Sequence, residues 1–120
     1  EGIIAQRLVR KICPYCKEEY RPSKEELKEL GLSGDHTFYR GRGCEQCMGT
    51  GYRGRTGIFE VLEVDEEIKK LIVKTQSATD IRNFARSRGF KSMLEDGIRK
   101  VLSGITTPEE VLKAVKAEEG

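Results

Sequence analysis

Two pairs of cysteines constrain the fold of this 120-residue chain more than any other feature. Each pair has the spacing Cys-x-x-Cys, and the pairs are Cys13 with Cys16 and Cys44 with Cys47. A turn of this spacing directs two thiolates at a common point, and two such turns complete a tetrahedral four-sulfur site of the kind that favours zinc. The sequence therefore predicts a structural Zn²⁺ site. Its four ligands leave no open coordination position for catalysis.

The segment between the two pairs is longer than in a simple zinc ribbon. It has 27 residues, whereas about 15–20 separate the pairs of a ribbon, so a folded element is expected there. Two disulfides and four unliganded thiols are the alternatives. Disulfides suit a secreted chain, but no signal peptide is visible before the first pair.

Each cysteine pair also matches a motif of another protein class. Cys13-Pro14-Tyr15-Cys16 matches the active-site tetrapeptide of glutaredoxin-like oxidoreductases, in which a buried strand precedes the motif and a helix follows it. Here residues 5–12 have helical spacing, which argues against a redox site. Residues 44–51 match the repeat unit of zinc-containing Hsp40 chaperones, but those proteins carry four copies and this chain has one.

The composition excludes two broad classes of protein. Hydrophobic residues make up 37% of the chain, charged residues 35%, and the mean hydropathy is −0.55, which rules out a membrane protein. The net charge of +2 gives no indication of wholesale phosphate binding. The alternative is a zinc-ribbon module that binds nucleic acid through the basic residues 40–55. No aromatic stacking platform is interleaved with them.

Hydrophobic spacing predicts an α+β fold, with a small zinc-knuckle lobe that holds a short strand element and then a mainly α-helical subdomain. The chain opens inside an amphipathic pattern and without Met, so we expect a fragment. The expected boundaries are a helix that ends at residue 12, a tetracysteine zinc-binding subdomain over 13–57, a strand over 58–64 and a helical subdomain over 65–116.

Capping signals and apolar spacing define the expected helices. Ser23 to Glu26 and Thr107 to Glu110 have the capping-box pattern at the start of two of them. Two further helices are expected between residues 65 and 89, and another carries Met93, Leu94, Ile98, Val101 and Leu102. We place Leu102 in the core, so Leu102→Asp is expected to destabilise the helical half.

With these residues laid out, the chain resembles the C-terminal part of the ATPases that drive type II secretion and type IV pilus assembly. The similarity runs from Ala5 to about Val115 and depends on the order of several short motifs. They are Gln6-Arg7-Leu8-Val9-Arg10, Gly43-Cys44-x-x-Cys47, Thr50-Gly51-Tyr52-x-Gly54-Arg55, Gly57-Ile58-x-Glu60-Val61-Leu62, Asp96-Gly97-x-x-Lys100-Val101 and Gly104-Ile105-Thr106-Thr107-x-Glu109-Glu110-Val111.

The resemblance implies a hexameric RecA-like motor with a tetracysteine zinc subdomain and a helical subdomain that packs on the nucleotide domain. The implied partners are that nucleotide-binding domain, neighbouring subunits of a homohexamer and the inner-membrane platform proteins of the machine, with no nucleic acid. The implied location is the cytoplasm, peripheral to the inner membrane through those partners. The loop and carboxylates that hold ATP and Mg²⁺ in the family lie upstream, so this chain is not expected to be an enzyme by itself.

Four arginines are candidates for an interface, and the single histidine is not a favoured ligand. Arg7 and Arg10 would lie closest to the nucleotide domain and are either inter-subunit contacts or ordinary surface residues and ion pairs. Arg53 and Arg55 are candidates for a protein interface, because Arg is enriched in such patches.

His36 would be a fifth ligand for a four-coordinate site, so we expect it to be a loop residue. We expect no catalytic residue in this chain.

Overall fold

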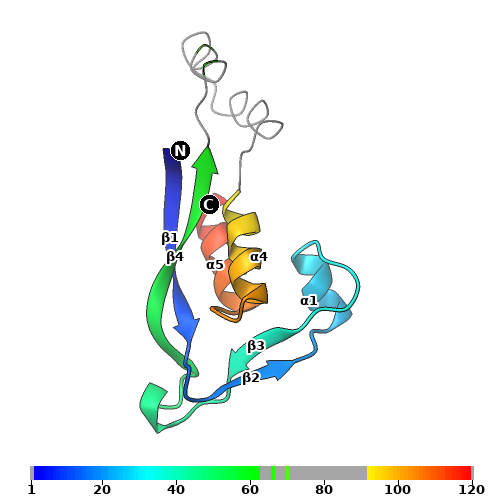
Figure 1. Cartoon of the computed structure of the whole chain (residues 1–120), viewed down its shortest axis with the longest axis vertical. Helices are drawn as coiled ribbons and strands as arrows, with labels where there is room; N and C mark the ends of the chain where they lie inside the picture. Colours follow the sequence, from blue (N-terminus) through cyan, green and yellow to red (C-terminus); the bar gives the residue numbers. More distant parts are fainter. Residues whose placement is uncertain (1, 63–65, 67–69, 71–91, 120) are drawn as a thin grey trace.

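The computed structural model describes residues 2–62, 66, 70 and 92–119 of the chain. Strands β1 and β4 form one two-stranded antiparallel sheet, and β2 and β3 form a second (Figure 1). Helices α4 and α5 pack against the first sheet, and the predicted α+β class is confirmed. The elements are β1 (Gly2–Ile12), β2 (Lys17–Tyr20), α1 (Lys24–Glu29), β3 (Phe38–Gly41), the 3₁₀ helix η1 (Glu45–Cys47), β4 (Tyr52–Leu62), α4 (Met93–Leu102) and α5 (Pro108–Glu119).

The predicted helix before the first cysteine pair is wrong, because that segment is strand β1. Val9 and Ile12 are both buried although they are three residues apart, a spacing that is typical of a helix. The register between β1 and β4 shifts between Arg10 and Ile12, so the regular alternation of inward and outward side chains is interrupted between these two residues. Leu8, which helical spacing placed on the apolar face, is 59% exposed. This interruption therefore made a strand look helical in the sequence.

Strand β4 contains residues 58–62 of the strand expected over 58–64, but it begins earlier, at Tyr52. Residues 63 and 64 lie outside the described residues. Strand β4 pairs with β1 along almost its whole length, with Val9 opposite Thr56 and Arg10 opposite Arg55. The two strands form a long curved ribbon in Figure 1, and the cysteine turns lie at the end where β1 stops and β4 starts. The ribbon therefore fixes where the first cysteine pair begins.

Helices α4 and α5 cross closely beside the ribbon. A side chain at Gly97 of α4 would place its Cβ 2.4 Å from Cγ1 of Val111 in α5, so only glycine allows this approach. Helix α4 lies against β4 and α5 against β1. The buried residues between the helices and the ribbon are Val9, Ile58, Met93 and Ala114.

The second sheet and α1 share a core with the helical pair. Ser23 caps α1 with both hydrogen bonds of the predicted capping box, and the chain turns at Gly31 with a φ of 72°. The Phe38 side chain is fully buried at the start of β3. It forms one cluster with Leu30, Val101 and Val111. The two helices therefore pack both on the ribbon and on the segment between the two cysteine turns.

Of the two adjacent core positions expected at the end of α4, one is buried and the other is wrong. Val101 is fully buried, whereas Leu102 is 38% exposed. Both lie in the last turn of α4, so the apolar pattern alone does not tell which of two adjacent residues faces inward. The two helices expected between residues 65 and 89 lie outside the described residues, apart from the helical residues Glu66 and Lys70.

A buried carboxylate joins α4 to β4. Asp96 accepts hydrogen bonds from the backbone N–H of Phe59 at 2.9 Å and from Lys100 Nζ at 2.8 Å, and it pairs with Arg99. Lys100 Nζ also donates to the Gly57 carbonyl oxygen at 2.8 Å. Burial raises the pKa of Asp96, but Lys100, the Phe59 N–H and Arg99 outweigh burial and hold that pKa below its ordinary value.

Within the part of the chain that the structure describes, no helix is both long enough and apolar enough to cross a bilayer.

The burial of Val101 and the exposure of Leu102 give a direct test. We expect Val101→Asp to destabilise the protein by about 3–5 kcal/mol, because it buries an unpaired carboxylate among Phe38, Leu30 and Val111. Leu102→Asp is the matched control and is expected to cost less than about 1 kcal/mol, since the new charge stays in water. Urea unfolding measures both. Equal destabilisation by the two variants would contradict this difference in burial.

The Asp96 network predicts how stability depends on pH. The folded pKa of Asp96 is below the unfolded value of about 3.9. Its stabilising contribution is therefore complete above the unfolded pKa and is lost as the pH falls through the folded pKa. Asp96→Asn is expected to be less stable than wild type at pH 7 and to lose less stability as the pH falls below about 4. Urea titrations at several pH values test this, and parallel pH profiles would count against it.

Candidate metal centre

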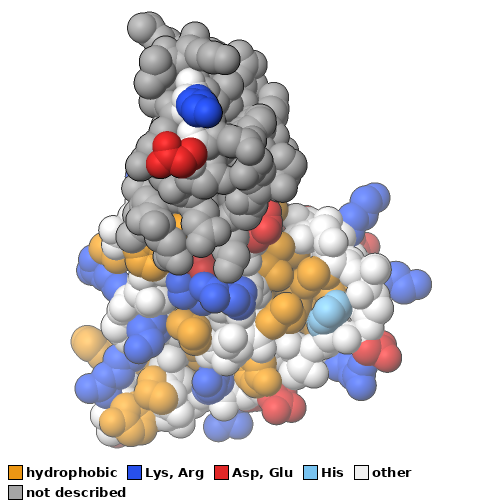
Figure 2. Space-filling view, turned by 45° about the horizontal axis from the view of Figure 1, so that its top comes forward, with side chains coloured by type: hydrophobic (Ala, Val, Ile, Leu, Met, Phe, Trp, Pro, Cys, Tyr) orange, Lys and Arg blue, Asp and Glu red, His pale blue; other side chains and the backbone are white. Residues whose placement is uncertain are grey.

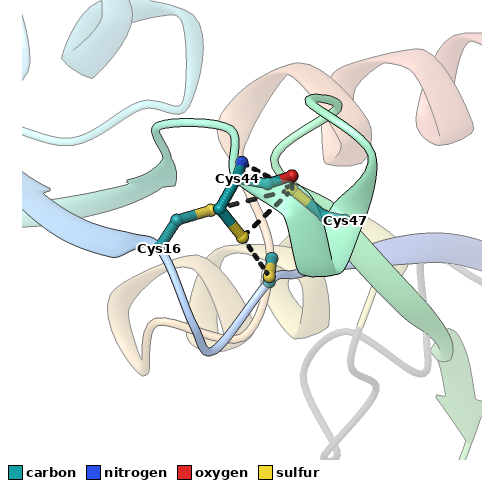
Figure 3. A group of neighbouring side chains, drawn as sticks. Cys16, Cys44 and Cys47 are labelled. Carbon is teal, nitrogen blue, oxygen red and sulfur yellow. Dashed lines mark hydrogen bonds between the residues drawn. The ribbon is translucent and has the colours of Figure 1, made fainter.

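Two turns at one end of the ribbon carry the four cysteines. Cys13 and Cys16 lie in the turn that follows β1, and Cys47 ends η1, which Cys44 precedes. Figure 3 shows the sulfur atoms of Cys16, Cys44 and Cys47 directed towards one another. Met48 follows η1 in the left-handed region, with a φ of 56°. The chain therefore reverses directly after the second pair, and this brings both turns to one point.

The distances between the sulfur atoms match a tetrahedral metal site. Cys13 Sγ is 3.7 Å from Cys44 Sγ, and Cys16 Sγ is 3.8 Å from Cys47 Sγ. All four Sγ atoms lie within 4.8 Å of one another. A regular tetrahedron with Zn–S bonds of about 2.3 Å places its sulfurs about 3.8 Å apart, whereas a disulfide bond is about 2.05 Å long. The four cysteines can therefore hold a metal ion as a group.

Backbone N–H groups surround the sulfurs, as a negatively charged thiolate centre requires. Gly43 N donates to Cys16 Sγ at 3.3 Å, and Cys44 N and Gly51 N donate to Cys47 Sγ at 3.2 and 3.1 Å. A metal bound by four thiolates has a net negative charge and is stabilised by such donors. The donor set and its surroundings fit a metal ion.

The local environment separates the pKa values of Cys16 and Cys47, two buried thiols that face each other across the centre. Burial raises the pKa of the Cys47 thiol, but the N–H groups of Cys44 and Gly51 lower it further, to about 6. Burial raises the pKa of the Cys16 thiol to about 12, although the Gly43 N–H opposes this. The Cys47 thiolate is therefore easy to form, whereas the Cys16 thiolate is costly in the absence of a cation.

Hydrogen bonds tie the cysteine turns to the ribbon and to the loop between α4 and α5. Cys13 N donates to the Gly51 carbonyl oxygen, and Ile12 N donates to the Ile105 carbonyl oxygen, both at 2.9 Å. A Cβ on Gly41 would lie 2.1 Å from the Gly51 carbonyl oxygen, so the two backbones meet where no side chain fits. The position of the centre is thus coupled to residues far along the sequence.

The structure brings three of the four candidate interface arginines together and separates the fourth. Arg7, Arg10 and Arg55 line one groove of about 440 Å³, together with Glu110 and Lys113. Arg53 lines a different groove, beside Tyr15. The four arginines therefore do not form one patch.

Arg10 is committed to an internal ion pair, one of the two roles that the sequence left open. Its Nη2 lies 3.0 Å from Glu110 Oε2, and its backbone N–H donates to Glu110 Oε1 at 2.8 Å. Its guanidinium group also lies over the Tyr52 ring, 4.1 Å from the ring centroid. Burial raises the pKa of Glu110, but both contacts with Arg10 outweigh burial and lower it.

His36 lies apart from the four cysteines. Its Nε2 donates to the Ser33 carbonyl oxygen at 2.9 Å, and it is not a member of the group that can hold a metal.

Sequence reasoning missed the contacts that join the helices to the ribbon. Glu110 was assigned to a capping box at the start of α5, and its backbone N–H does bond to Thr107 Oγ1 at 3.3 Å. Its side chain instead reaches Arg10. The Tyr52 hydroxyl bonds to Thr107 Oγ1 at 2.8 Å. No local pattern indicates such pairs, since their members are 55 and 100 residues apart.

The sequence that forms this centre matches a family of secretion proteins. The family model described as "Type II/IV secretion system protein" matches residues 1–113. The chain belongs to this family, and the resemblance identified in the sequence is confirmed.

Curated relatives agree with this assignment. The chain is 51% identical over 115 residues to the type IV pilus assembly ATPase PilB of Thermus thermophilus, with 92% of this chain and 13% of the relative covered. It is 45% identical over 119 residues to type II secretion system protein E of Pseudomonas aeruginosa, covering 98% of this chain and 24% of that protein. The type II secretion system ATPase E of Vibrio cholerae is 41% identical over 117 residues, with 96% and 23% covered. The chain thus spans a quarter or less of the length of these relatives.

Cobalt spectroscopy tests the metal centre directly. We expect the metal-free chain to bind one Co²⁺, with the intense visible bands of a tetrahedral thiolate complex, because all four sulfurs already lie at tetrahedral spacing. Cys47→Ser is expected to weaken Co²⁺ binding at least tenfold and to change the bands. His36→Ala is the control and should leave the spectrum unchanged. A spectrum that is altered only by the His36 change would contradict the four-sulfur assignment.

Proposed function

We propose that this chain is the non-catalytic, zinc-binding C-terminal module of a hexameric ATPase that powers protein secretion or pilus assembly. The observation that carries the proposal is the four-sulfur cluster, which lies within a chain whose relatives are named as secretion and pilus assembly ATPases. Cys13, Cys16, Cys44 and Cys47 would hold a structural Zn²⁺.

A structural metal supplies stability that this region lacks by other means. The buried apolar residues form one cluster between the ribbon and the helices and a second between the helices, α1 and β3, whereas Cys13, Cys16 and Cys47 form a small cluster of their own. Zinc binding contributes on the order of 10–16 kcal/mol in isolated zinc-finger peptides, which is enough to organise a lobe of this size. Four thiolate ligands leave no position for a water or a substrate.

The proposed role of the helical subdomain is mechanical. We expect residues 65–116 to pack on the nucleotide-binding domain of the same protein and to transmit its nucleotide-driven motion to the zinc-binding subdomain at 13–57. The ties between the ribbon, the loop after α4 and the cysteine turns support this, since a displacement of α4 or α5 would move the metal centre with them. ATP and Mg²⁺ would bind only in the upstream part of the parent.

The proposed partners follow from the same reasoning. The parent would form a homohexamer that contacts the inner-membrane platform proteins of a secretion or pilus machine, and it would therefore be a cytoplasmic protein held at the inner membrane by those partners. Arg7 and Arg55 are the proposed inter-subunit residues, because they border the same groove on the ribbon. Nucleic-acid binding by a zinc ribbon is the second candidate, favoured only by the basic segment 40–55.

Turnover measurements test the non-catalytic assignment. We expect the purified chain to contain about one zinc ion per molecule and to hydrolyse no ATP, because the sequence contains no glycine-rich loop followed by Lys and Ser or Thr. The full-length parent, assayed in parallel, is the positive control. ATP turnover by the chain that persists through further purification would contradict the proposal, and so would a folded preparation without metal.

A further inference from the structure

A groove of about 570 Å³ lies on the outer side of the first cysteine turn. It is lined by the end of β1, the first cysteine turn, the starts of β2 and β4, and the loop after α4. The side chains that matter for its chemistry are Lys11, Pro14, Tyr15, Lys17 and Arg53. At the lower left of Figure 2, basic side chains lie beside apolar ones, at the end of the molecule where Figure 1 draws the turns after β1 and before β4.

The charges in this groove have one sign. Lys11, Lys17 and Arg53 line it, and no Asp or Glu among the described residues does so. The ion pairs elsewhere in the described part of the chain engage Arg10, Arg21, Arg40, Arg99 and Lys100. Lys17 Nζ donates to a backbone carbonyl, that of Gly104, at 3.1 Å. No carboxylate of the described residues therefore neutralises the three groove cations.

An aromatic side chain gives the groove an apolar surface next to these cations. Tyr15 is 65% exposed although the cysteines on either side of it in the turn are buried. The Arg53 guanidinium lies over its ring, 5.2 Å from the centroid, and Arg53 Nη1 donates to Gln46 Oε1 at 3.5 Å. Both contacts hold Arg53 in place while its remaining N–H groups stay available, so the arginine is pre-organised for a carboxylate.

We propose that this groove binds an acidic polypeptide segment of a partner protein, whose carboxylates contact Lys11, Lys17 and Arg53 and whose apolar side chain packs on Tyr15. The proposal builds on the role of Arg53 as a protein-interface residue, which the sequence analysis suggested, and it names the kind of partner that would bind there. Single-stranded nucleic acid fits less well, because its bases need several exposed aromatic rings for stacking. Among the residues that the structure describes, one ring, that of Tyr15, borders the groove, and Arg53 already covers one of its faces.

Fluorescence anisotropy of the zinc-loaded chain with a labelled acidic peptide tests this surface. The probe is a twelve-residue peptide of repeated Glu-Glu-Leu, and the same peptide with Gln in place of Glu is its control. We expect the Glu peptide to bind with an affinity that falls as salt increases and the Gln peptide not to bind. Lys11→Glu and Arg53→Glu are each expected to weaken binding at least tenfold. Lys28→Glu makes the same charge change on α1, outside the groove, and is expected to weaken binding less than twofold.

Three results would overturn the proposal. Equal weakening by Lys28→Glu would show general electrostatic attraction, and equal binding of the Gln peptide would show that carboxylates are not recognised. Preference for a single-stranded oligonucleotide of the same charge would assign the groove to nucleic acid. Zinc content is measured on every sample, so a fully zinc-loaded chain that fails to bind the peptide contradicts the groove alone and leaves the proposed function intact.

Discussion

Four thiols from two distant turns meet within 4.8 Å, and the arrangement of the surrounding chain depends on this convergence. Bringing the thiols together places the start of β2 beside the end of β3, because the same two turns begin and end that sheet. Deprotonating them concentrates negative charge, which three backbone N–H groups reduce only in part. A divalent cation supplies the balance, and we therefore regard the proposed zinc as the organising element of this region.

The ribbon of β1 and β4 connects this centre to the helices. At its cysteine end, the loop after α4 accepts a hydrogen bond from Ile12 and donates one from Thr106 Oγ1 to the Arg10 carbonyl oxygen at 2.7 Å. Further along, Glu110 holds Arg10 and Asp96 holds the backbone of Phe59. Each helix is thus fixed to one strand by a buried carboxylate, which suits a part that is proposed to transmit motion between a nucleotide domain and its partners.

The sequence was sufficient to predict features that depend on local chemistry, and it failed where distant contacts decide. The Cys-x-x-Cys pairs and the Ser23 cap were predicted correctly as local structure, because their spacing fixes their geometry. Strand β1 was mistaken for a helix, since the register against β4 shifts between Arg10 and Ile12, and Val9 and Ile12 are both buried at a spacing of three. The role of Glu110 was missed because its partner is 100 residues away. Both errors concern contacts between distant segments, which local sequence patterns do not predict.

Hydrogen–deuterium exchange, with and without zinc, tests the central claim that the metal centre organises this end of the molecule. The amides of Gly43, Cys44 and Gly51 donate to the sulfurs, so we expect them to be protected from exchange in the zinc-loaded chain. After chelation of the metal, we expect their exchange rates to rise at least tenfold. The Ile12 amide, which donates to the loop after α4, should lose protection with them, while amides in the middle of the β1–β4 ribbon keep theirs. Unchanged protection at Gly43, Cys44 and Gly51 after full removal of the metal would contradict the account.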